Sequence, residues 1–172
     1  YGAETPFLRP KKIARAKVLD YPVMEHALKS LGLFKSSSNV ILVFLRPTMP
    51  LRSYKDIDSG IKFMLKNNAD CIRSVRKSPY SPYWTLRINK KKLIPFMREV
   101  GKYQKGHRRQ DLPKTYICDG YIDAIKVNTL FKLKTFPPKN IFAFKSLTKE
   151  YVDIDTEEDF KKAEMILNNK ND

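Results

Sequence analysis

The chain has 172 residues, of which 42% are hydrophobic and 12% aromatic. This length and composition fit one globular domain with a buried core and exclude a disordered chain. The net charge of +16 would suit nucleic-acid binding, but the 34 Lys and Arg are spread along the chain without a nucleic-acid motif, so nucleic acid is an unfavoured partner.

Two further features concern the surroundings of the protein. The longest apolar run, residues 40–45, is too short for a membrane span. Cys71 and Cys118 lack the spacing of a metal or redox site, which favours a reducing cytoplasm. The sequence opens at Tyr1 instead of a methionine, and we interpret it as an N-terminally incomplete domain.

The first half of the chain predicts alternating helices and strands. Apolar periodicity predicts a helix over residues 21–33, with Pro22 in its first turn. The run NVILVFL at residues 39–45 predicts a strand buried on both faces, as in a parallel sheet. A helix over residues 54–67 and a strand over residues 71–75 complete a βαβ unit. The predicted fold class is therefore α/β.

The second half begins with an excursion. Residues 78–114 are rich in proline, tyrosine and basic side chains and suggest a hairpin arm inserted into a single domain of residues 1–172. Strands are then predicted at residues 121–127 and 140–144, and the chain ends in a helix over residues 156–169.

The segment RPTMPLR follows the most apolar predicted strand. Ligands of open α/β sheets bind at the carboxyl ends of the strands, so Arg46, Thr48 and Arg52 are candidates to face a ligand. The alternative is a rigid turn built by Pro47 and Pro50, with no role in binding.

The segment HRRQDLPKTY, residues 107–116, gathers guanidinium, amide, carboxylate and ammonium groups. The planar guanidinium of Arg108 or Arg109 suits the carboxylate of an acidic sugar or a phosphate. The alternative is a solvated basic loop.

The segment VDIDTEEDF carries Asp153 and Asp155 with one isoleucine between them. If residues 151–155 form a short strand, both carboxylates point to the same face and can offer hard oxygen ligands to Mg²⁺. The alternative is the start of a helix, in which Asp155 is the N-cap and Glu158 completes a capping box.

Taken in order, these segments resemble the acylneuraminate cytidylyltransferases, which activate sialic acid and related nonulosonic acids as CMP-sugars. The matching motifs are YGAETPFLRP, LRPTMPLRSYKDID, SPYW, RRQDLPKTY with DGYID, and VDIDTEEDF. The resemblance implies a Rossmann-like, three-layer fold with a mostly parallel sheet, and a dimerisation arm at residues 78–114 of a homodimer. It also implies that a sialic-acid-like sugar acid attacks CTP, as in the biosynthesis of cell-surface polysaccharides.

The resemblance assigns roles to individual residues. Asp153 and Asp155 would hold Mg²⁺ against the nucleotide, and Arg109 would meet the acidic sugar. The further candidates for substrate binding are Arg46, Thr48, Arg52, Gln110, Lys114, Asp119 and Phe136, the last as an aromatic wall of the sugar pocket.

The sequence also departs from the family. The phosphate-gripping loop of the type PARxGSKxxxxKN is absent, so we expect the chain as given to be inactive and not to bind CTP normally. Arg46 replaces a glutamine, Ala16 an acidic residue and Asp123 a pocket tyrosine. These departures leave the identity of the sugar acid open.

Two alternatives remain. One is a non-catalytic, basic module that binds nucleic acid or another anion on a degenerate copy of this fold. The other is a cytidylyltransferase for a different keto-sugar acid, such as a 3-deoxy-octulosonic acid, against which RRQDLPKTY and GYID argue.

Overall fold

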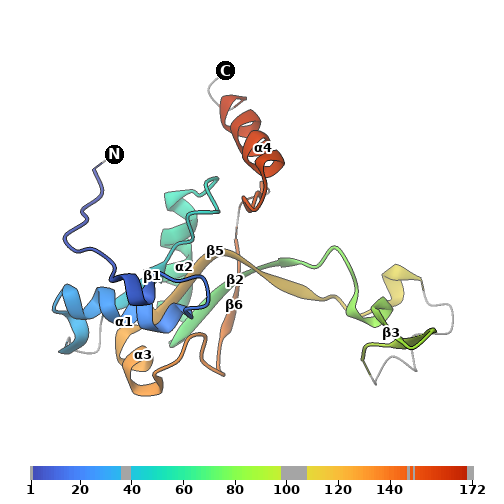
Figure 1. Ribbon diagram of the computed structural model, residues 1–172, viewed down its shortest axis with the longest axis horizontal. Coiled ribbons are helices and arrows are strands. Elements are labelled where there is room, and N and C mark those ends of the chain that lie inside the picture. Colours follow the sequence, from blue (N-terminus) through green and yellow to red (C-terminus); the bar gives the residue numbers. More distant parts are fainter. Residues whose placement is uncertain (1, 36–39, 98–107, 147, 149, 170–172) are drawn as a thin grey trace. The chain divides into compact units, whose positions relative to one another are not determined.

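The computed structural model describes residues 2–35, 40–97, 108–146, 148 and 150–169. The chain divides into two compact units (Figure 1). The first unit comprises Tyr1–Ser74 and Gly120–Asp172, and the second comprises Val75–Asp119. The second unit contains the predicted arm at residues 78–114; its role in dimerisation stays a prediction.

A sheet of four strands, in the order β1-β5-β2-β6, organises the described chain. The strands are β1 (Ile41–Phe44), β2 (Cys71–Lys77), β5 (Tyr116–Lys126) and β6 (Phe142–Lys145). Strand β5 runs antiparallel to β1. It also runs antiparallel to β2. The amide of Lys126, at the end of β5, donates to the carbonyl of Asp70, just before the start of β2, at 2.9 Å. Strands β1 and β2 therefore run parallel to each other with β5 between them.

Helices cover both faces of this sheet. They are α1 (Asp20–Ser30), α2 (Tyr54–Lys66) and α3 (Val127–Leu133). Helix α4 (Glu157–Asn168) packs instead in a separate small cluster, through Ala163 against Leu51 and Val152. Alternate strand residues point to opposite faces, and the two core clusters follow this alternation. Ile41 and Val43 of β1 pack in the cluster that contains Met64 of α2. Leu42 and Phe44 pack in the cluster that contains these residues of α1 and α3: Met24, Leu28 and Leu130.

The predicted α/β class is confirmed, with helical layers on either side of a mixed sheet. One detail of the prediction is wrong: β1 is half-buried along its length, not buried on both faces. The reason is its position at the edge of the described sheet.

The helix boundaries follow local signals. Ser53 caps α2 by accepting a hydrogen bond from the amide of Lys55 at 3.2 Å, as serine commonly does at a helix start. Asn67 follows the last residue of α2, and Asn68 adopts a left-handed conformation with φ of 45°. Short 3-10 helices lie at Lys11–Ile13, Leu33–Lys35, Pro82–Trp84 and Arg109–Asp111.

Tyr121 fastens α2 to β5 from within the first unit. Its side chain is 1% exposed, and its hydroxyl donates to Oδ2 of Asp56 at 2.9 Å. The same hydroxyl accepts a hydrogen bond from the amide of Ser53, also at 2.9 Å. Asp56 is a buried carboxylate, with 3% of its surface exposed, so this hydroxyl satisfies polar groups that burial would otherwise make costly.

The second unit contains a two-stranded hairpin of β3 (Leu86–Asn89) and β4 (Lys92–Pro95). Arg87 lies opposite Ile94, and Lys90 in the turn adopts a φ of 53°. The hairpin suggested by the sequence is therefore present.

Candidate functional site

The RPTMPLR segment follows β1 as a turn anchored to β5. Nε of Arg52 donates to the carbonyl of Tyr121 at 2.8 Å, and its Nη2 donates to the carbonyl of Arg46 at 3.0 Å. Its guanidinium carbon also lies 5.6 Å from the centre of the Tyr121 ring. Met49 is buried beneath the turn. Arg52 thus fixes the turn, and its predicted role in substrate binding remains untested.

The DID segment lies beside this turn. The amide of Ile154 donates to the carbonyl of Thr48 at 2.8 Å. Apolar contacts support the hydrogen bond, because Ile154 packs against a small cluster of Leu51, Val152 and Ala163. Two segments that are about 100 residues apart in the sequence are therefore adjacent, with Asp153 and Asp155 on either side of the bonded residue.

The short strand predicted at residues 151–155 is wrong, because these residues form no strand in the structure. The predicted cap is also shifted by one residue. Thr156, not Asp155, caps α4, and Asp159, not Glu158, completes the capping box. Oδ2 of Asp159 accepts from the Thr156 hydroxyl at 2.7 Å, and hydrogen bonds from Thr156 lower the pKa of the Asp159 carboxyl.

This shift matters because Asp155 contributes only its amide to the capping arrangement, as a donor to Asp159 at 3.3 Å. Its carboxylate is exposed, whereas Asp153 is half-buried. Within the residues that the structure describes, no group of three or more metal-binding side chains is found. The pair of carboxylates alone matches the one or two that proteins commonly supply to Mg²⁺.

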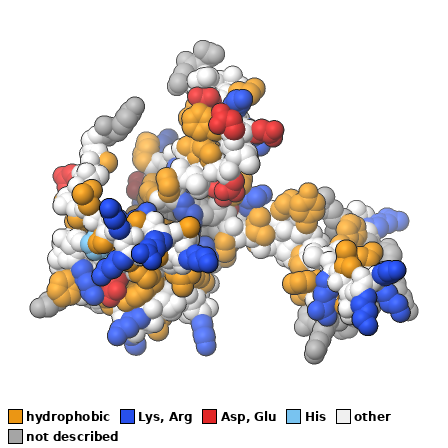
Figure 2. Space-filling view, in the orientation of Figure 1, with side chains coloured by type: hydrophobic (Ala, Val, Ile, Leu, Met, Phe, Trp, Pro, Cys, Tyr) orange, Lys and Arg blue, Asp and Glu red, His pale blue; other side chains and the backbone are white. Residues whose placement is uncertain are grey.

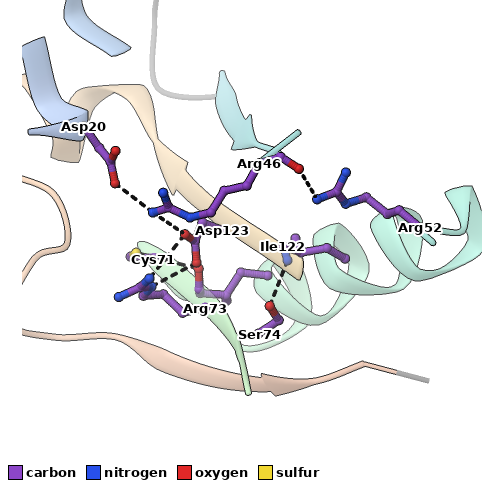
Figure 3. A network of polar contacts seen from close by, with 9 residues as sticks. Asp20, Arg46, Arg52, Cys71, Arg73, Ser74, Ile122 and Asp123 are labelled. Atoms are coloured by element: carbon purple, nitrogen blue, oxygen red, sulfur yellow. Dashed lines mark hydrogen bonds and ion pairs between the residues drawn. The ribbon is translucent and has the colours of Figure 1, made fainter. Parts of the chain in front are cut away.

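A network of charged side chains lies on β5 and its neighbours (Figure 3). Asp123 is completely buried, and its carboxylate accepts from Nε and Nη2 of Arg73 on β2 at 2.9 and 3.4 Å. Nη2 of Arg46 lies 3.8 Å from the same carboxylate and donates to Oδ2 of Asp20 at 2.8 Å. The network joins α1, the turn after β1, β2 and β5.

Phe136 borders this network. It is 8% exposed and belongs to the core cluster with Met24 and Leu28. Its ring meets Phe44 edge-on at 6.4 Å, and the guanidinium carbon of Arg73 lies 5.9 Å from its centre. Most of this ring is therefore used in the core, and its role as a pocket wall stays a prediction.

The second unit holds the other predicted residues. Gln110 and Lys114 line a cavity of about 220 Å³ together with Lys77, Ser78, Ser81, Leu112, Pro113 and Thr115. The backbone of Arg109 begins a 3-10 helix, while its side chain and all of His107 lie outside the described part of the chain. Asp119 is buried at the end of this unit.

Arg73 and Asp20 were not among the residues predicted from the sequence. The available signal was a charged residue inside each of two predicted strands, Arg73 in one and Asp123 in the other. Opposite charges buried in one sheet must be paired. However, the order of the strands, and hence the pairing, was not evident.

No family model matches the chain. Post-translational flagellin modification protein B of Campylobacter coli is 29% identical over 175 residues, covering 99% of this chain and 71% of that protein. The chain thus resembles a flagellin modification protein along almost its whole length. Among the described residues, no helix is long and apolar enough to cross a membrane.

Proposed function

We propose that this chain is a cytidylyltransferase domain that activates a sialic-acid-like nonulosonic acid with CTP. In the proposed reaction, the anomeric hydroxyl oxygen of the sugar acid forms a bond to the α-phosphorus of CTP. The bond from that phosphorus to the bridging oxygen breaks, pyrophosphate leaves and the hydroxyl proton is released. Such phosphoryl chemistry depends chiefly on positioning and on neutralising the developing charge.

The observation that carries the proposal is the 2.8 Å hydrogen bond from the amide of Ile154 to the carbonyl of Thr48. It brings the carboxylate-bearing segment beside the turn after β1, as a site at the ends of the strands requires. The same two segments are among those whose sequence resembles the cytidylyltransferases. Local chain geometry and sequence motif therefore point to the same site.

Asp153 and Asp155 are the residues that would hold Mg²⁺ in this proposal. The fit rests on their hard oxygen donors and on the Thr156 cap, which leaves the Asp155 carboxylate out of the capping box. When bound, the ion would supply positive charge beside the phosphates of the nucleotide.

The sugar acid is the second proposed substrate. We assign Arg109 to its carboxylate, with Gln110 and Lys114 as polar contacts from the cavity in the second unit. Two ammonium groups, hydroxyls and an amide around one cavity suit a ligand that is both anionic and rich in hydroxyls. The similarity to a post-translational flagellin modification protein fits the proposed reaction, because an activated sugar is one kind of donor that the modification of a protein can use.

A homodimer is part of the proposal, formed through the second unit. Its hairpin exposes large apolar side chains, with Ile88 77% and Leu93 66% exposed. Nearby Trp84 is 52% and Phe96 65% exposed. Gathered apolar side chains on a surface commonly mark a protein interface, and we assign this one to a second copy of the chain.

The proposal is tested by comparing Asp155→Asn with Thr156→Ala in the chain joined to the N-terminal strand and phosphate-gripping loop of an active family member. We expect pyrophosphate release that requires CTP, a sialic acid and Mg²⁺. Asp155→Asn should abolish it, with the free energy of unfolding nearly unchanged. Thr156→Ala should retain turnover and lose about 1 kcal/mol of stability, because it removes the helix cap.

Full turnover by Asp155→Asn would refute the metal assignment. Absence of CTP-dependent chemistry, together with binding of random DNA that weakens steeply with salt, would instead favour the non-catalytic basic module. On the face seen in Figure 2, Lys and Arg side chains lie over both units.

A further inference from the structure

The guanidinium of Arg46 lies near two carboxylates, one of which is closer than the other. Its Nη2 donates to Asp20 at 2.8 Å and lies 3.8 Å from Asp123. Its side chain is 34% exposed. Within the described part of the chain, the Asp20 carboxylate accepts the one hydrogen bond that this guanidinium donates.

Asp123 does not depend on Arg46 for its charge balance. The fork of Arg73 already binds its carboxylate, with Nε at 2.9 Å, and the Asp123 side chain is 1% exposed. Arg46 stands farther away. Its main partner is Asp20, whose side chain is 32% exposed. A partly exposed ion pair of this kind is weak and readily exchanged.

The position of Arg46 is fixed by contacts that do not involve Asp20. A Cβ placed on Gly120, whose φ is +68°, would lie 3.2 Å from Cδ of Arg46, so the arginine stem packs directly over this glycine. The guanidinium carbon lies 5.2 Å from the centre of the Phe44 ring. Arg52 holds the Arg46 carbonyl. These contacts position the Arg46 side chain independently of Asp20.

The location of Arg46 is next to the proposed site. It precedes Thr48 by two residues in the turn that the amide of Ile154 contacts. The four side chains of the network, two arginines and two aspartates, sum to zero charge (Figure 3). Without Asp20, the remaining three sum to +1, which favours one incoming anion.

We propose that Arg46 binds an oxyanion of the ligand and that Asp20 occupies this arginine until the ligand replaces it. Asp20 is thus an internal competitor of the ligand. The inference rests on the proposed function for the ligand class, which is either the carboxylate of the sugar acid or a phosphate group. The carboxylate is planar and the phosphate tetrahedral, and the guanidinium fork can bind either oxyanion.

Isothermal calorimetry on the full chain tests the proposal, with inorganic pyrophosphate in one arm and N-acetylneuraminate in the other. Asp20→Asn should tighten binding of one of these anions about two- to fivefold, since a weak competing ion pair is removed. Glu25→Gln is the matched control. It removes one negative charge from the same helix, and its partner is Lys29 instead of Arg46. The arm that responds identifies the source of the oxyanion.

Arg46→Gln should weaken binding, and Asp20→Asn should give no gain in that background, as a double-mutant cycle measures. If Arg46→Gln does not fold by circular dichroism, Arg46→Lys replaces it, because lysine keeps the charge but loses the planar fork.

If the Arg46–Asp20 ion pair were only structural, Asp20→Asn would not tighten the binding of either anion. Weaker or unchanged binding in Asp20→Asn relative to Glu25→Gln overturns the inference, as does an equal gain in the Arg46→Gln background. Absence of binding of both anions by both wild type and Asp20→Asn also overturns it. Turnover is not measured here, so these results are separate from the outcome of the CTP assay.

Discussion

Tyr121→Phe removes one buried hydroxyl and leaves the ring in place. The hydroxyl donates to Asp56 and accepts from the amide of Ser53, both at 2.9 Å. Phenylalanine fills nearly the same volume, so the change creates almost no cavity. The substitution therefore isolates the contribution of this hydrogen-bonded junction between α2 and β5.

The expected loss at pH 8 is about 2 kcal/mol of the free energy of unfolding. A hydrogen bond to a charged group contributes about 1.5–3 kcal/mol and a neutral one about 0.5–1.5 kcal/mol. The sum is reduced because the variant no longer buries the hydroxyl itself. Asp56, at 3% exposure, cannot readily recover the lost bond from water.

The pH dependence of the stability difference between wild type and Tyr121→Phe is a second, independent test. Burial, with the Asp56 carboxylate adding to it, raises the pKa of Tyr121 from 10.0 to about 12, although the Ser53 amide opposes the shift. Because the folded pKa lies above the unfolded one, the hydroxyl contributes fully below pH 10, and its contribution falls as the pH rises toward 12. By pH 11 the difference between wild type and Tyr121→Phe should have narrowed by about 1.4 kcal/mol.

Urea unfolding at pH 8 and pH 11, followed by circular dichroism, measures both effects. Tyr54→Phe is the control, because Tyr54 is 71% exposed and a surface change of this kind should cost less than about 0.5 kcal/mol. The reasoning fails if Tyr121→Phe is as stable as Tyr54→Phe at pH 8. It also fails if the difference from wild type widens as the pH rises.

Arg73→Ala should lower the free energy of unfolding by about 3–5 kcal/mol, because it leaves the completely buried Asp123 without its nearest cation. Urea unfolding measures this loss, with Arg87→Ala, at an exposed position on β3, as the control. A loss equal to that of the control would contradict the assigned pairing. Ile88→Lys should convert a homodimer to a monomer of 20.1 kDa, because it puts a charge into the exposed apolar surface of the hairpin. Light scattering reads the mass, and a wild-type chain that is already monomeric at high concentration would refute the proposed interface.

Local patterns in the sequence were enough to predict most of the elements. The apolar spacing of residues 54–67 predicted α2, which the structure places at Tyr54–Lys66. The apolar run at residues 39–45 predicted β1 at Ile41–Phe44. Helix periodicity and strand runs depend on neighbours within a few residues, so the sequence contains this information directly.

Local patterns failed where two adjacent residues competed for one task. Asp155 and Thr156 are both good N-caps, and the sequence alone favoured the pair Asp155 and Glu158. The structure selects Thr156 with Asp159, whose Oδ2 accepts from the Thr156 amide at 3.0 Å and from its hydroxyl at 2.7 Å. Two registers one residue apart offer equally suitable side chains, so local spacing does not distinguish them.

What the sequence determined by itself is the α/β class, the positions of most helices and strands, and the segments around Arg46, Arg109 and Asp155 that resemble cytidylyltransferase motifs. Only the tertiary structure decided which of their side chains meet. Arg73 and Asp123 are 50 residues apart, and Arg46 and Asp20 are 26 apart. The first pair forms because β5 lies beside β2, and the second because α1 packs against β1. Strand order and helix packing depend on contacts across the whole sheet, which no local pattern contains.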